Sequence, residues 1–304
     1  MKTEEKKTQK IFSSMHTHTF FCDGKDDVES MCCAAYENNL FAIGFSAHAP
    51  ISRQIGHESE WNLKEERVDE YITEVLAARK RWDGKLKVFL GYEADYIKGK
   101  RSPLDSDITV LNLDYLIGSV HYLFPENGAD FFTVDGTLQE FEKGLKEGYN
   151  GDLNALMNSY YDAQMEMIKK GGFDILGHPD ILKKNTKKIN YPNKQNLFEN
   201  EKERQEEIAT AISKTGIVIE VNTGGINRNK IDEVYPSLTF LKIIKKYNIP
   251  VIITADAHCA KDIRGNYDIA INTLICANFK EHVLFNGKTT TIANPVCAWL
   301  KEEI

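Results

Sequence analysis

The sequence has no hydrophobic run long enough to cross a membrane, and its first segment lacks the pattern of a secretory signal. A transmembrane helix needs roughly 20 consecutive apolar residues, and a secretory signal needs a shorter apolar centre that the charged segment 1–10 does not contain. We therefore expect a cytoplasmic protein that makes no contact with membranes. We also expect residues 1–10 to form a flexible charged tail.

Basic residues are also fewer than acidic ones. The chain has 38 Lys and Arg against 45 Asp and Glu, which gives a formal net charge of -7. A general nucleic-acid-binding protein needs a basic face that replaces the counterions around phosphates. The charge balance argues against nucleic acid as a partner and favours a small-molecule substrate, while it leaves the oligomeric state open.

The six cysteines form no Cys-x-x-Cys pair and no spacing typical of a disulfide framework. We therefore expect reduced thiols. Cys22 and Cys259 each stand beside a candidate metal ligand, so thiolate ligation remains a lesser alternative to a role as small packing residues.

The pattern of apolar residues predicts an α/β protein. Runs rich in β-branched residues alternate with longer stretches of helical periodicity, as in β-α units that build a parallel sheet. Without an internal repeat or a long linker, we expect 1–304 to form a single domain. The predicted strands are 10–18, 41–49, 87–95, 115–123, 173–180, 216–223 and 250–258. The predicted helices are 26–39, 63–82, 196–215 and 237–248, together with an apolar stripe from Leu153 to Ile168 that reads as core packing.

Six of the seven predicted strands end in His, Asp or Glu, and the seventh ends in Asn222. The carboxyl ends of parallel strands form one face, on which α/β proteins assemble their active sites. Residues two apart on a strand point to the same side, so His16 with His18, and Asp256 with His258, can face one pocket. Imidazole and carboxylate ligands together suit Zn, Mn or Fe better than Mg or Ca.

A single histidine at a strand end is more often an ordinary hydrogen-bonded residue than a ligand. Asp23, likewise, could be only part of an Asp-Gly turn. However, six of the eight histidines fall at strand ends beside acidic residues, and burying such a group without a cation would be costly. We expect the other two, His57 in a loop and His282 in a helix, to be ordinary residues.

The ordered motifs resemble those of the polymerase and histidinol phosphatase (PHP) superfamily and, within it, the histidinol-phosphate phosphatases. The resemblance covers roughly 11–260 and is carried by HTH (16–18), SAHAP (46–50), GYEAD (91–95), GSVHYL (118–123), GHPD (177–180), EVNT (220–223) and ADAH (255–258). It implies a distorted (β/α)7 TIM-like barrel with its active site at the C-terminal ends of the strands, and three divalent transition-metal ions.

The resemblance also implies how the ligands are shared. The first ion would take His16, His18, Glu93 and Asp256; the second Glu93, as a bridge, with His121 and His178; the third Asp23, His48 and His258. Two positions depart from the family pattern. Ala47 stands where many relatives have an acidic residue, and Asp23 stands where other members have histidine.

Such a cluster is suited to hydrolysis of phosphate monoesters. Two adjacent ions can hold a bridging hydroxide that attacks phosphorus, and a third can neutralise charge on the transition state. The resemblance implies that the substrate is histidinol phosphate and the reaction one of histidine biosynthesis, and we predict that Glu93, Asp256 and His258 are catalytic. Asp180 is a candidate proton donor, with helix capping as the alternative. Candidate phosphate-binding residues are Arg228, Arg264 and Lys183 or its neighbour Lys184.

Three other functions stay open at this point. The first is a PHP phosphoesterase that acts on nucleotides or other small phosphate esters. The second is an amidohydrolase-type enzyme, which usually has a lysine or carbamate bridge where Glu93 stands here. The third is an inactive, metal-stabilised binding module, although such decay usually removes ligands and every expected ligand position is filled.

Overall fold

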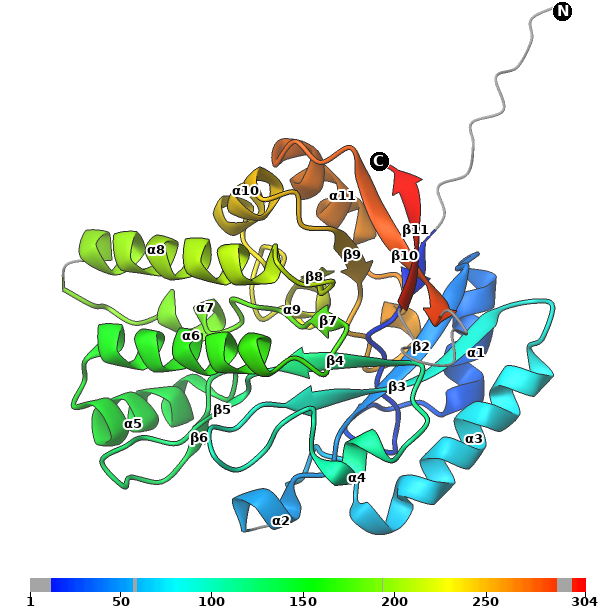
Figure 1. Cartoon of the computed structure of the whole chain (residues 1–304), viewed down its shortest axis with the longest axis horizontal. Helices are drawn as coiled ribbons and strands as arrows, with labels where there is room; N and C mark the ends of the chain where they lie inside the picture. Colours follow the sequence, from blue (N-terminus) through cyan, green and yellow to red (C-terminus); the bar gives the residue numbers. More distant parts are fainter. Residues whose placement is uncertain (1–11, 57–58, 193, 289–296) are drawn as a thin grey trace, which may run out of the picture.

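Seven short parallel strands form the centre of the molecule (Figure 1). The computed structural model describes residues 12–56, 59–192, 194–288 and 297–304, so the predicted tail 1–10 and His57 lie outside the described residues. The strands follow one another around the sheet in the order β1-β2-β3-β4-β7-β8-β9. Their bounds are β1 Ser13–Ser14, β2 Ala42–His48, β3 Lys87–Asp95, β4 Tyr115–Ser119, β7 Ile175–Leu176, β8 Val218–Asn222 and β9 Val251–Thr254.

The sheet closes on itself beyond the ends of its first and last strands. Thr17 and Ala257 form a parallel bridge. The amide of His18 donates to the carbonyl of Ala257 over 2.8 Å, and the amide of Ala257 donates to the carbonyl of His16 over 3.1 Å. The predicted α/β fold with a (β/α)7 barrel is therefore confirmed. All seven strands were predicted, but the regular segments of the first and fifth, Ser13–Ser14 and Ile175–Leu176, are much shorter than expected.

Large side chains fill the barrel interior at its N-terminal half. Tyr115 occupies much of this space, and its hydroxyl donates to the carbonyl of Met15 over 2.6 Å. A Cβ added at Gly91 would lie 2.6 Å from the Tyr115 ring and 2.8 Å from its backbone oxygen. Glycine at this position is therefore what allows a tyrosine inside the barrel.

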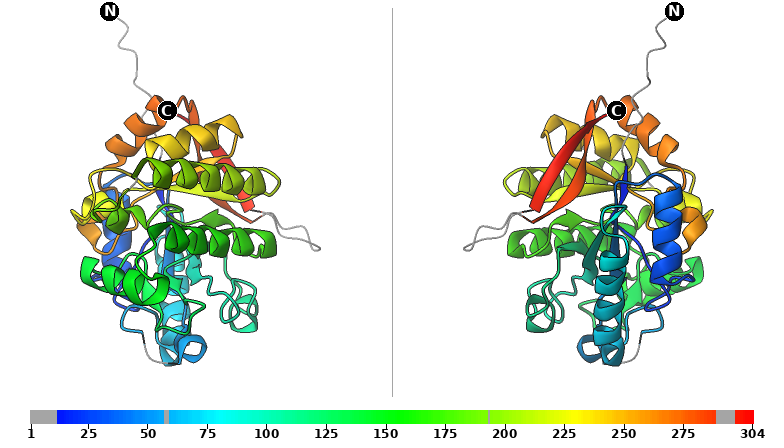
Figure 2. Two further views of the ribbon diagram at one scale, coloured as in Figure 1. Left: turned by 90° about the vertical axis from the view of Figure 1, so that its left-hand side faces the viewer. Right: turned by 90° about the vertical axis from the view of Figure 1, so that its right-hand side faces the viewer.

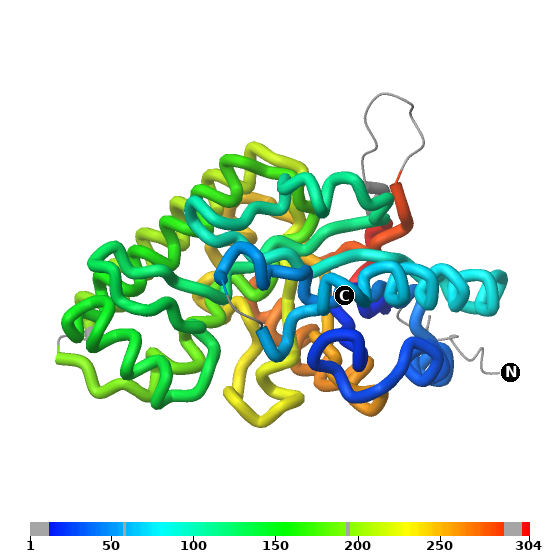
Figure 3. The backbone as a smooth tube through the Cα atoms, turned by 90° about the horizontal axis from the view of Figure 1, so that it is seen from below, coloured from blue at the N-terminus to red at the C-terminus, as the bar shows by residue number. Residues whose placement is uncertain are grey.

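Helices cover the outside of the barrel (Figure 2). Figure 3 separates α5, α6 and α8, in green, from α1 and α3, in blue and cyan, which lie on the opposite side. The longer helices are α1 Val28–Glu37, α3 Val68–Arg81, α5 Leu138–Tyr149, α6 Leu153–Lys170, α8 Lys194–Ile212, α10 Leu238–Lys246 and α11 Tyr267–Cys276. The short ones are α2 Ser52–Ile55, α4 Ser106–Thr109, α7 Lys183–Thr186, α9 Gly224–Asn227, η1 Glu65–Arg67 and η2 Ala260–Asp262.

The predicted helices are present, and the apolar stripe of α6 is buried as core, as predicted. Helices α5 and α11 were not predicted. Among the described helices, none is both long enough and apolar enough to cross a lipid bilayer.

A C-terminal hairpin, also not predicted, covers the N-terminal end of the barrel. It consists of β10 Glu281–Lys288 and β11 Cys297–Glu303, paired antiparallel, and Figure 2 shows it in orange and red across one side of the molecule. Val283 and Phe285 join one buried cluster with residues that begin several barrel strands, including Ala42 and Tyr115. His282 is therefore in a buried strand and stacks on Phe12 at 5.7 Å, which corrects its predicted helical position.

A second, smaller antiparallel pair lies near the other end of the barrel. It joins β5 Tyr122–Leu123 to β6 Phe132–Thr133. The amide of Val134, just after β6, donates to the carbonyl of His121 over 2.8 Å. The pair thereby fixes the chain that follows β4 at the mouth of the barrel.

Candidate metal centre and substrate cavity

The nine predicted ligand residues meet at the C-terminal mouth of the barrel. His16 and His18 follow β1, His48 ends β2, Glu93 lies in β3, and the loop before α1 carries Asp23. The remaining ones follow β4, β7 and β9 and are His121, His178, Asp256 and His258. Seven of the nine are buried, whereas Asp23 and His258 lie closer to solvent.

Glu93 lies at the centre of the group, with its two carboxylate oxygens directed at different histidines. Its Oε2 is 3.0 Å from His16 Nε2 and 3.1 Å from His48 Nδ1. Its Oε1 is 2.9 Å from His178 Nε2 and 3.4 Å from His121 Nε2. One carboxylate can therefore join two neighbouring sets of ligand atoms, as expected of a bridging residue.

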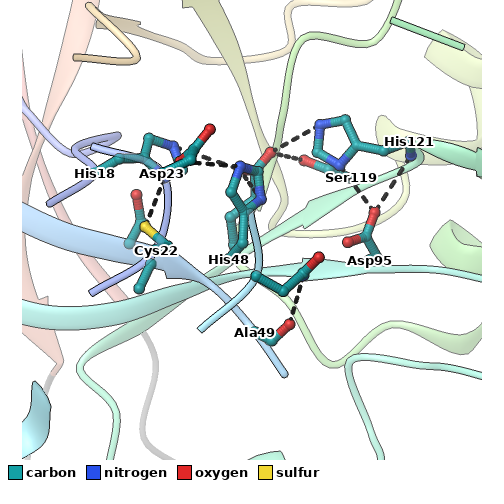
Figure 4. A network of polar contacts seen from close by, with 12 residues as sticks. His18, Cys22, Asp23, His48, Ala49, Asp95, Ser119 and His121 are labelled. Atoms are coloured by element: carbon teal, nitrogen blue, oxygen red, sulfur yellow. Dashed lines mark hydrogen bonds and ion pairs between the residues drawn. The ribbon is translucent and has the colours of Figure 1, made fainter. Parts of the chain in front are cut away.

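The outer part of the cluster is built around Asp23. Its Oδ2 accepts from His258 Nε2 over 3.0 Å, and its Oδ1 lies 3.5 Å from His18 Nδ1 and 3.8 Å from His48 Nε2. Figure 4 shows His48 between Asp23 on one side and His121 on the other. The potential ligand atoms of His18, Asp23, His48 and His258 all lie within 4.8 Å of one another, so this group contains the three residues expected for one ion and adds His18.

Four further groups satisfy the same 4.8 Å criterion. They are His16 with His178 and Asp256, His16 with His18 and Glu93, Glu93 with His121 and His178, and His48 with Asp95 and His121. The structure thus brings together all the residues that the sequence patterns put forward as ligands. Asp256 also has a left-handed backbone, with φ 47°, a conformation that is uncommon in non-glycine residues.

Burial and opposite charges act against each other on the pKa values of these groups. Burial alone would lower the pKa of His16, but the carboxylates of Glu220, Glu93 and Asp256 raise it well above its ordinary value. For Glu93 burial would raise the pKa, and the surrounding histidines lower it well below its ordinary range. Burial and the neighbouring histidines lower the pKa of His18 to about 3. The carboxylates are therefore ionised and His18 is neutral, as metal ligands require, whereas His16 holds a proton that a bound cation would displace.

The donor atoms fit a divalent cation. His18 Nε2 and His48 Nδ1 are buried and make no hydrogen bond, although His48 Nδ1 lies 3.1 Å from Glu93 Oε2. A buried nitrogen without a hydrogen bond is costly in a protein interior. His18 Nε2 nevertheless lies 3.3 Å from Asp256 Oδ1 and 3.6 Å from Glu93 Oε2. A cation among these atoms would supply the missing partner and neutralise the carboxylates. Among the described residues, no candidate ligand group includes a cysteine, and burial raises the pKa of the Cys22 thiol to about 12.

Two buried carboxylates that the sequence analysis missed hold the histidines in place. Glu220 Oε1 accepts from His16 Nδ1 over 2.6 Å, and its Oε2 accepts from the backbone amide of His178 over 2.8 Å. Asp95 Oδ1 accepts from His121 Nδ1 over 2.8 Å. Each contact leaves the Nε2 atom of the ring directed at Glu93, and such contacts fix the tautomer and raise the basicity of a ligand.

A signal for both residues is present in the sequence. Asp95 stands two residues after Glu93, and Glu220 stands two residues before Asn222, so each shares a strand face with a residue already singled out. Asn222 itself donates to Glu220 Oε2 over 3.1 Å and to Asp256 Oδ2 over 3.3 Å, so it connects these two carboxylates.

A cavity of about 260 Å³ opens over the cluster, and Arg228 lines it. The guanidinium donates through Nη2 to Asp256 Oδ2 over 2.9 Å and through Nη1 to the Asp256 carbonyl over 2.8 Å. Nη1 also lies 2.8 Å from His258 Nδ1. Lys184 and Lys230 line the same cavity, so its wall combines three cationic side chains with the carboxylates at its base.

Among the predicted residues outside the metal-ligand set, Asp180, Lys183 and Arg264 do not line this cavity. Asp180 Oδ2 accepts from the amide of Ser237 over 2.8 Å and lies 3.1 Å from Lys183 Nζ, which donates to the carbonyl of Val234 over 2.7 Å. Arg264 stacks on Phe12 at 4.6 Å and donates to the carbonyl of Asn38 over 3.2 Å. The structure therefore places Asp180, Lys183 and Arg264 away from the metal-site cavity, each in contact with other groups. Asp180 accepts from the N-cap residue of α10, Ser237, a role similar to the helix capping that was the alternative for this residue.

The closed seven-stranded barrel and the histidine and carboxylate cluster at its mouth define an α/β barrel protein with a candidate polynuclear metal centre. The family model described as PHP domain matches residues 14–224. The chain therefore belongs to the PHP domain family, as the sequence motifs predicted.

Relatives of known name agree with this assignment. A Deinococcus radiodurans protein named "Probable histidinol-phosphatase" is 28% identical over 260 residues, which cover 85% of this chain and 91% of that protein. A solved structure of HisK from Listeria monocytogenes has a TM-score of 0.74 at 23% identity, over 84% of this chain and 99% of the other. Histidinol phosphate phosphatase from Lactococcus lactis, solved with Zn, L-histidinol and phosphate, has a TM-score of 0.63 at 20% identity, over 91% of this chain and 97% of the other.

Proposed function

We propose that this chain is a divalent-metal-dependent phosphomonoesterase that hydrolyses L-histidinol phosphate to L-histidinol and inorganic phosphate, a reaction of histidine biosynthesis. The observation that carries the proposal is the position of Glu93, whose two oxygens face separate histidine groups at the base of the cavity. The relative solved with Zn, L-histidinol and phosphate supports both the metal and the substrate class.

The ligand groups support three ions, with Zn, Mn or Fe as the candidates. His16, His18, Glu93 and Asp256 would hold the first, and Glu93, His121 and His178 the second. Asp23, His48 and His258 would hold the third, with His18 close to both outer and inner groups. When bound, such ions provide Lewis acidity toward phosphoryl oxygen and make water a stronger nucleophile at neutral pH.

Arg228 is the residue best placed to bind the phosphate group. A guanidinium has five N–H donors in a planar fork, and its contacts with Asp256 and His258 leave further donors for an anion in the cavity. These same contacts orient the fork before substrate arrives. Lys184 and Lys230 add positive charge to the cavity wall and would attract the phosphate dianion.

The chain also prepares its ligands for catalysis. Glu220 and Asp95 hold His16 and His121 so that the Nε2 atoms of both rings face Glu93. Asp256 connects the two parts of the site, since it contacts both His18 and Arg228. Ligand and phosphate-binding residues are thus held by a single hydrogen-bonded network, which limits the reorganisation needed during the reaction.

Steady-state kinetics on metal-analysed protein would test the proposal. We expect kcat/KM for L-histidinol phosphate to exceed that for nucleotide and sugar phosphates by at least about 100-fold, because a cavity with specific polar contacts discriminates strongly. Glu93→Gln should lose activity, and Glu203→Gln, an exposed substitution on α8, should retain it. Equal turnover of all substrates would favour a general PHP phosphoesterase and remove the proposed substrate, while an active Glu93→Gln variant would remove the bridging role.

A further inference from the structure

A second cavity, of about 350 Å³, lies on the other side of the segment that follows β7. His178 lines the metal-site cavity, whereas Asp180, two residues later, lines the second one. The second cavity is bounded by α7, by α8 and by the chain that leads into α10. Figure 1 shows α7 beside α8, on the side of α6. Nothing in the proposed phosphatase reaction uses this cavity.

One carboxylate oxygen in the wall has no partner. Asp180 is fully buried, and its Oδ2 is occupied by the amide of Ser237 and by Lys183. Its Oδ1 is buried and accepts no hydrogen bond. A buried carboxylate oxygen that lacks a donor is unusual in a native protein, and a donor from a cavity occupant would satisfy it.

A second carboxyl group, that of Glu201 on α8, lines the same cavity. Tyr161 from α6 donates to its Oε1 over 3.2 Å. Burial, together with the negative charge of Asp180, raises the pKa of Glu201 to about 7, so the two carboxyl groups interact electrostatically. A cation between two such groups is favoured over an anion.

The nearest lysines do not fill this role. Lys183 Nζ donates to the Val234 carbonyl, lies 3.3 Å from Glu233 Oε1 and sits 4.9 Å from the centre of the Tyr235 ring. Lys187 pairs with the same Glu233 carboxylate. Lys183 therefore contacts Asp180 through Oδ2 and also contacts Glu233, while Lys187 contacts Glu233. Asp180 Oδ1 stays without a donor and is left to an occupant of the cavity.

The rest of the wall is partly apolar. Ile189, Tyr191, Leu197 and Phe198 line it, and the side chain of Phe198 is 47% exposed. An occupant with an apolar body would bury part of this surface and gain roughly 25 cal/mol for each Å² removed from water. The volume lies within the range of pockets that hold small organic ligands, about 300–1,000 Å³.

We propose that this cavity is a second ligand site, which binds a small organic ammonium ion with an apolar or aromatic body. The ammonium group donates to Asp180 Oδ1 and to Glu201, and the body packs against Leu197 and Phe198. The site lies outside the metal centre, so its occupancy does not depend on the proposed phosphatase activity.

Isothermal titration calorimetry with phenethylammonium at about pH 8, on the metal-loaded full chain, would test this inference. We expect saturable binding to the unmodified protein and a loss of at least about 10-fold in affinity with Glu201→Gln, since one charged acceptor is removed. Glu199→Gln, an exposed change of the same charge on the same helix, should bind as the unmodified protein does. Asp180→Asn gives a second variant with the same expected loss.

An uncharged probe of the same shape separates charge recognition from apolar binding. We expect 2-phenylethanol to bind at least about 10-fold more weakly than phenethylammonium, because it brings no cation to the two carboxyl groups. Equal affinity for the two probes would overturn the inference. So would unchanged affinity in both Glu201→Gln and Asp180→Asn, which would place the probe elsewhere, or no heat of binding up to about 10 mM.

Discussion

Glu220 Oε1 lies 2.6 Å from His16 Nδ1, although 204 positions separate the two residues in the chain. The same carboxylate accepts from the amide of His178 and from the hydroxyl of Thr254. One buried side chain therefore connects the segments that follow β1, β7 and β9. The imidazole of His16 is oriented by a partner that itself has little freedom to move.

This arrangement predicts a specific effect of Glu220→Gln. The amide keeps the shape of the side chain but loses its charge, so His16 becomes a less basic ligand, and metal affinity should fall by about 10- to 100-fold. Metal content measured by mass spectrometry after dialysis, and activity titrated against added metal, would check this. Activity should return at high metal concentration. A variant that retains its metal through dialysis would contradict the prediction.

Arg228→Lys should weaken substrate binding while leaving the metal centre assembled. Lysine retains the positive charge but cannot reach both the Asp256 carboxylate and carbonyl with a planar fork. We expect KM for the phosphate ester to rise by about 10- to 100-fold with unchanged metal content. Arg264→Lys is the matched control, since Arg264 contacts Phe12 and Asn38 away from the cavity. An equal effect of both changes would count against the role of Arg228.

The sequence predicted the barrel and its ligands because strand geometry is regular. A period of two places His16 with His18, and Asp256 with His258, on one side of the chain, and parallel strands bring their carboxyl ends together. Family motifs added the way in which the ligands are shared. The expectation for Arg228 rested only on its position after β8, and here the structure places the side chain at the cavity.

The three predicted residues that the structure places away from the metal-site cavity have something in common. Asp180, Lys183 and Arg264 all follow barrel strands, but they lie in loops and short helices, where residue spacing does not determine the direction of a side chain. Asp180 points toward the start of α10 and not into the metal-site cavity, and Arg264 points toward Phe12. The C-terminal hairpin was not predicted for a different reason. The residues of β10 pack against residues at the beginning of the barrel strands, such as Tyr115, and sequence patterns do not reveal such tertiary contacts.

Gly91→Ala should destabilise the folded protein. The added methyl group would meet the Tyr115 ring at 2.6 Å and its backbone oxygen at 2.8 Å, so the barrel interior would have to shift. Overpacking of this kind costs about 1–3 kcal/mol, which urea denaturation can measure. Gly216→Ala is the control, because no atom lies within 4 Å of a Cβ at that position. Equal stability of the two variants would show that the interior accommodates the methyl group.

Glu201 should make the folded protein less stable as pH rises. Its pKa is raised to about 7 in the folded state by burial and by Asp180, against an ordinary value of 4.5. The charged and polar groups around it are Asp180, Lys183 and Lys187 from the β7 side and Tyr161 from α6. The folded state therefore holds this proton more tightly than the unfolded state. The contribution of Glu201 to stability is therefore greatest below about pH 4.5, decreases as pH rises through about 7 and is lost above that value, a change on the order of 3 kcal/mol.

Glu201→Gln isolates this contribution from the titration of the histidine cluster, which both proteins share. At saturating metal, the difference in unfolding free energy between Glu201→Gln and the unmodified protein should grow in favour of the variant from pH 5 to about pH 8. Glu199→Gln, exposed on the same helix, should show a constant difference over this range. A difference for Glu201→Gln that does not change with pH would mean that Glu201 titrates as an ordinary surface carboxyl, and the electrostatic link between α8 and Asp180 would then be absent.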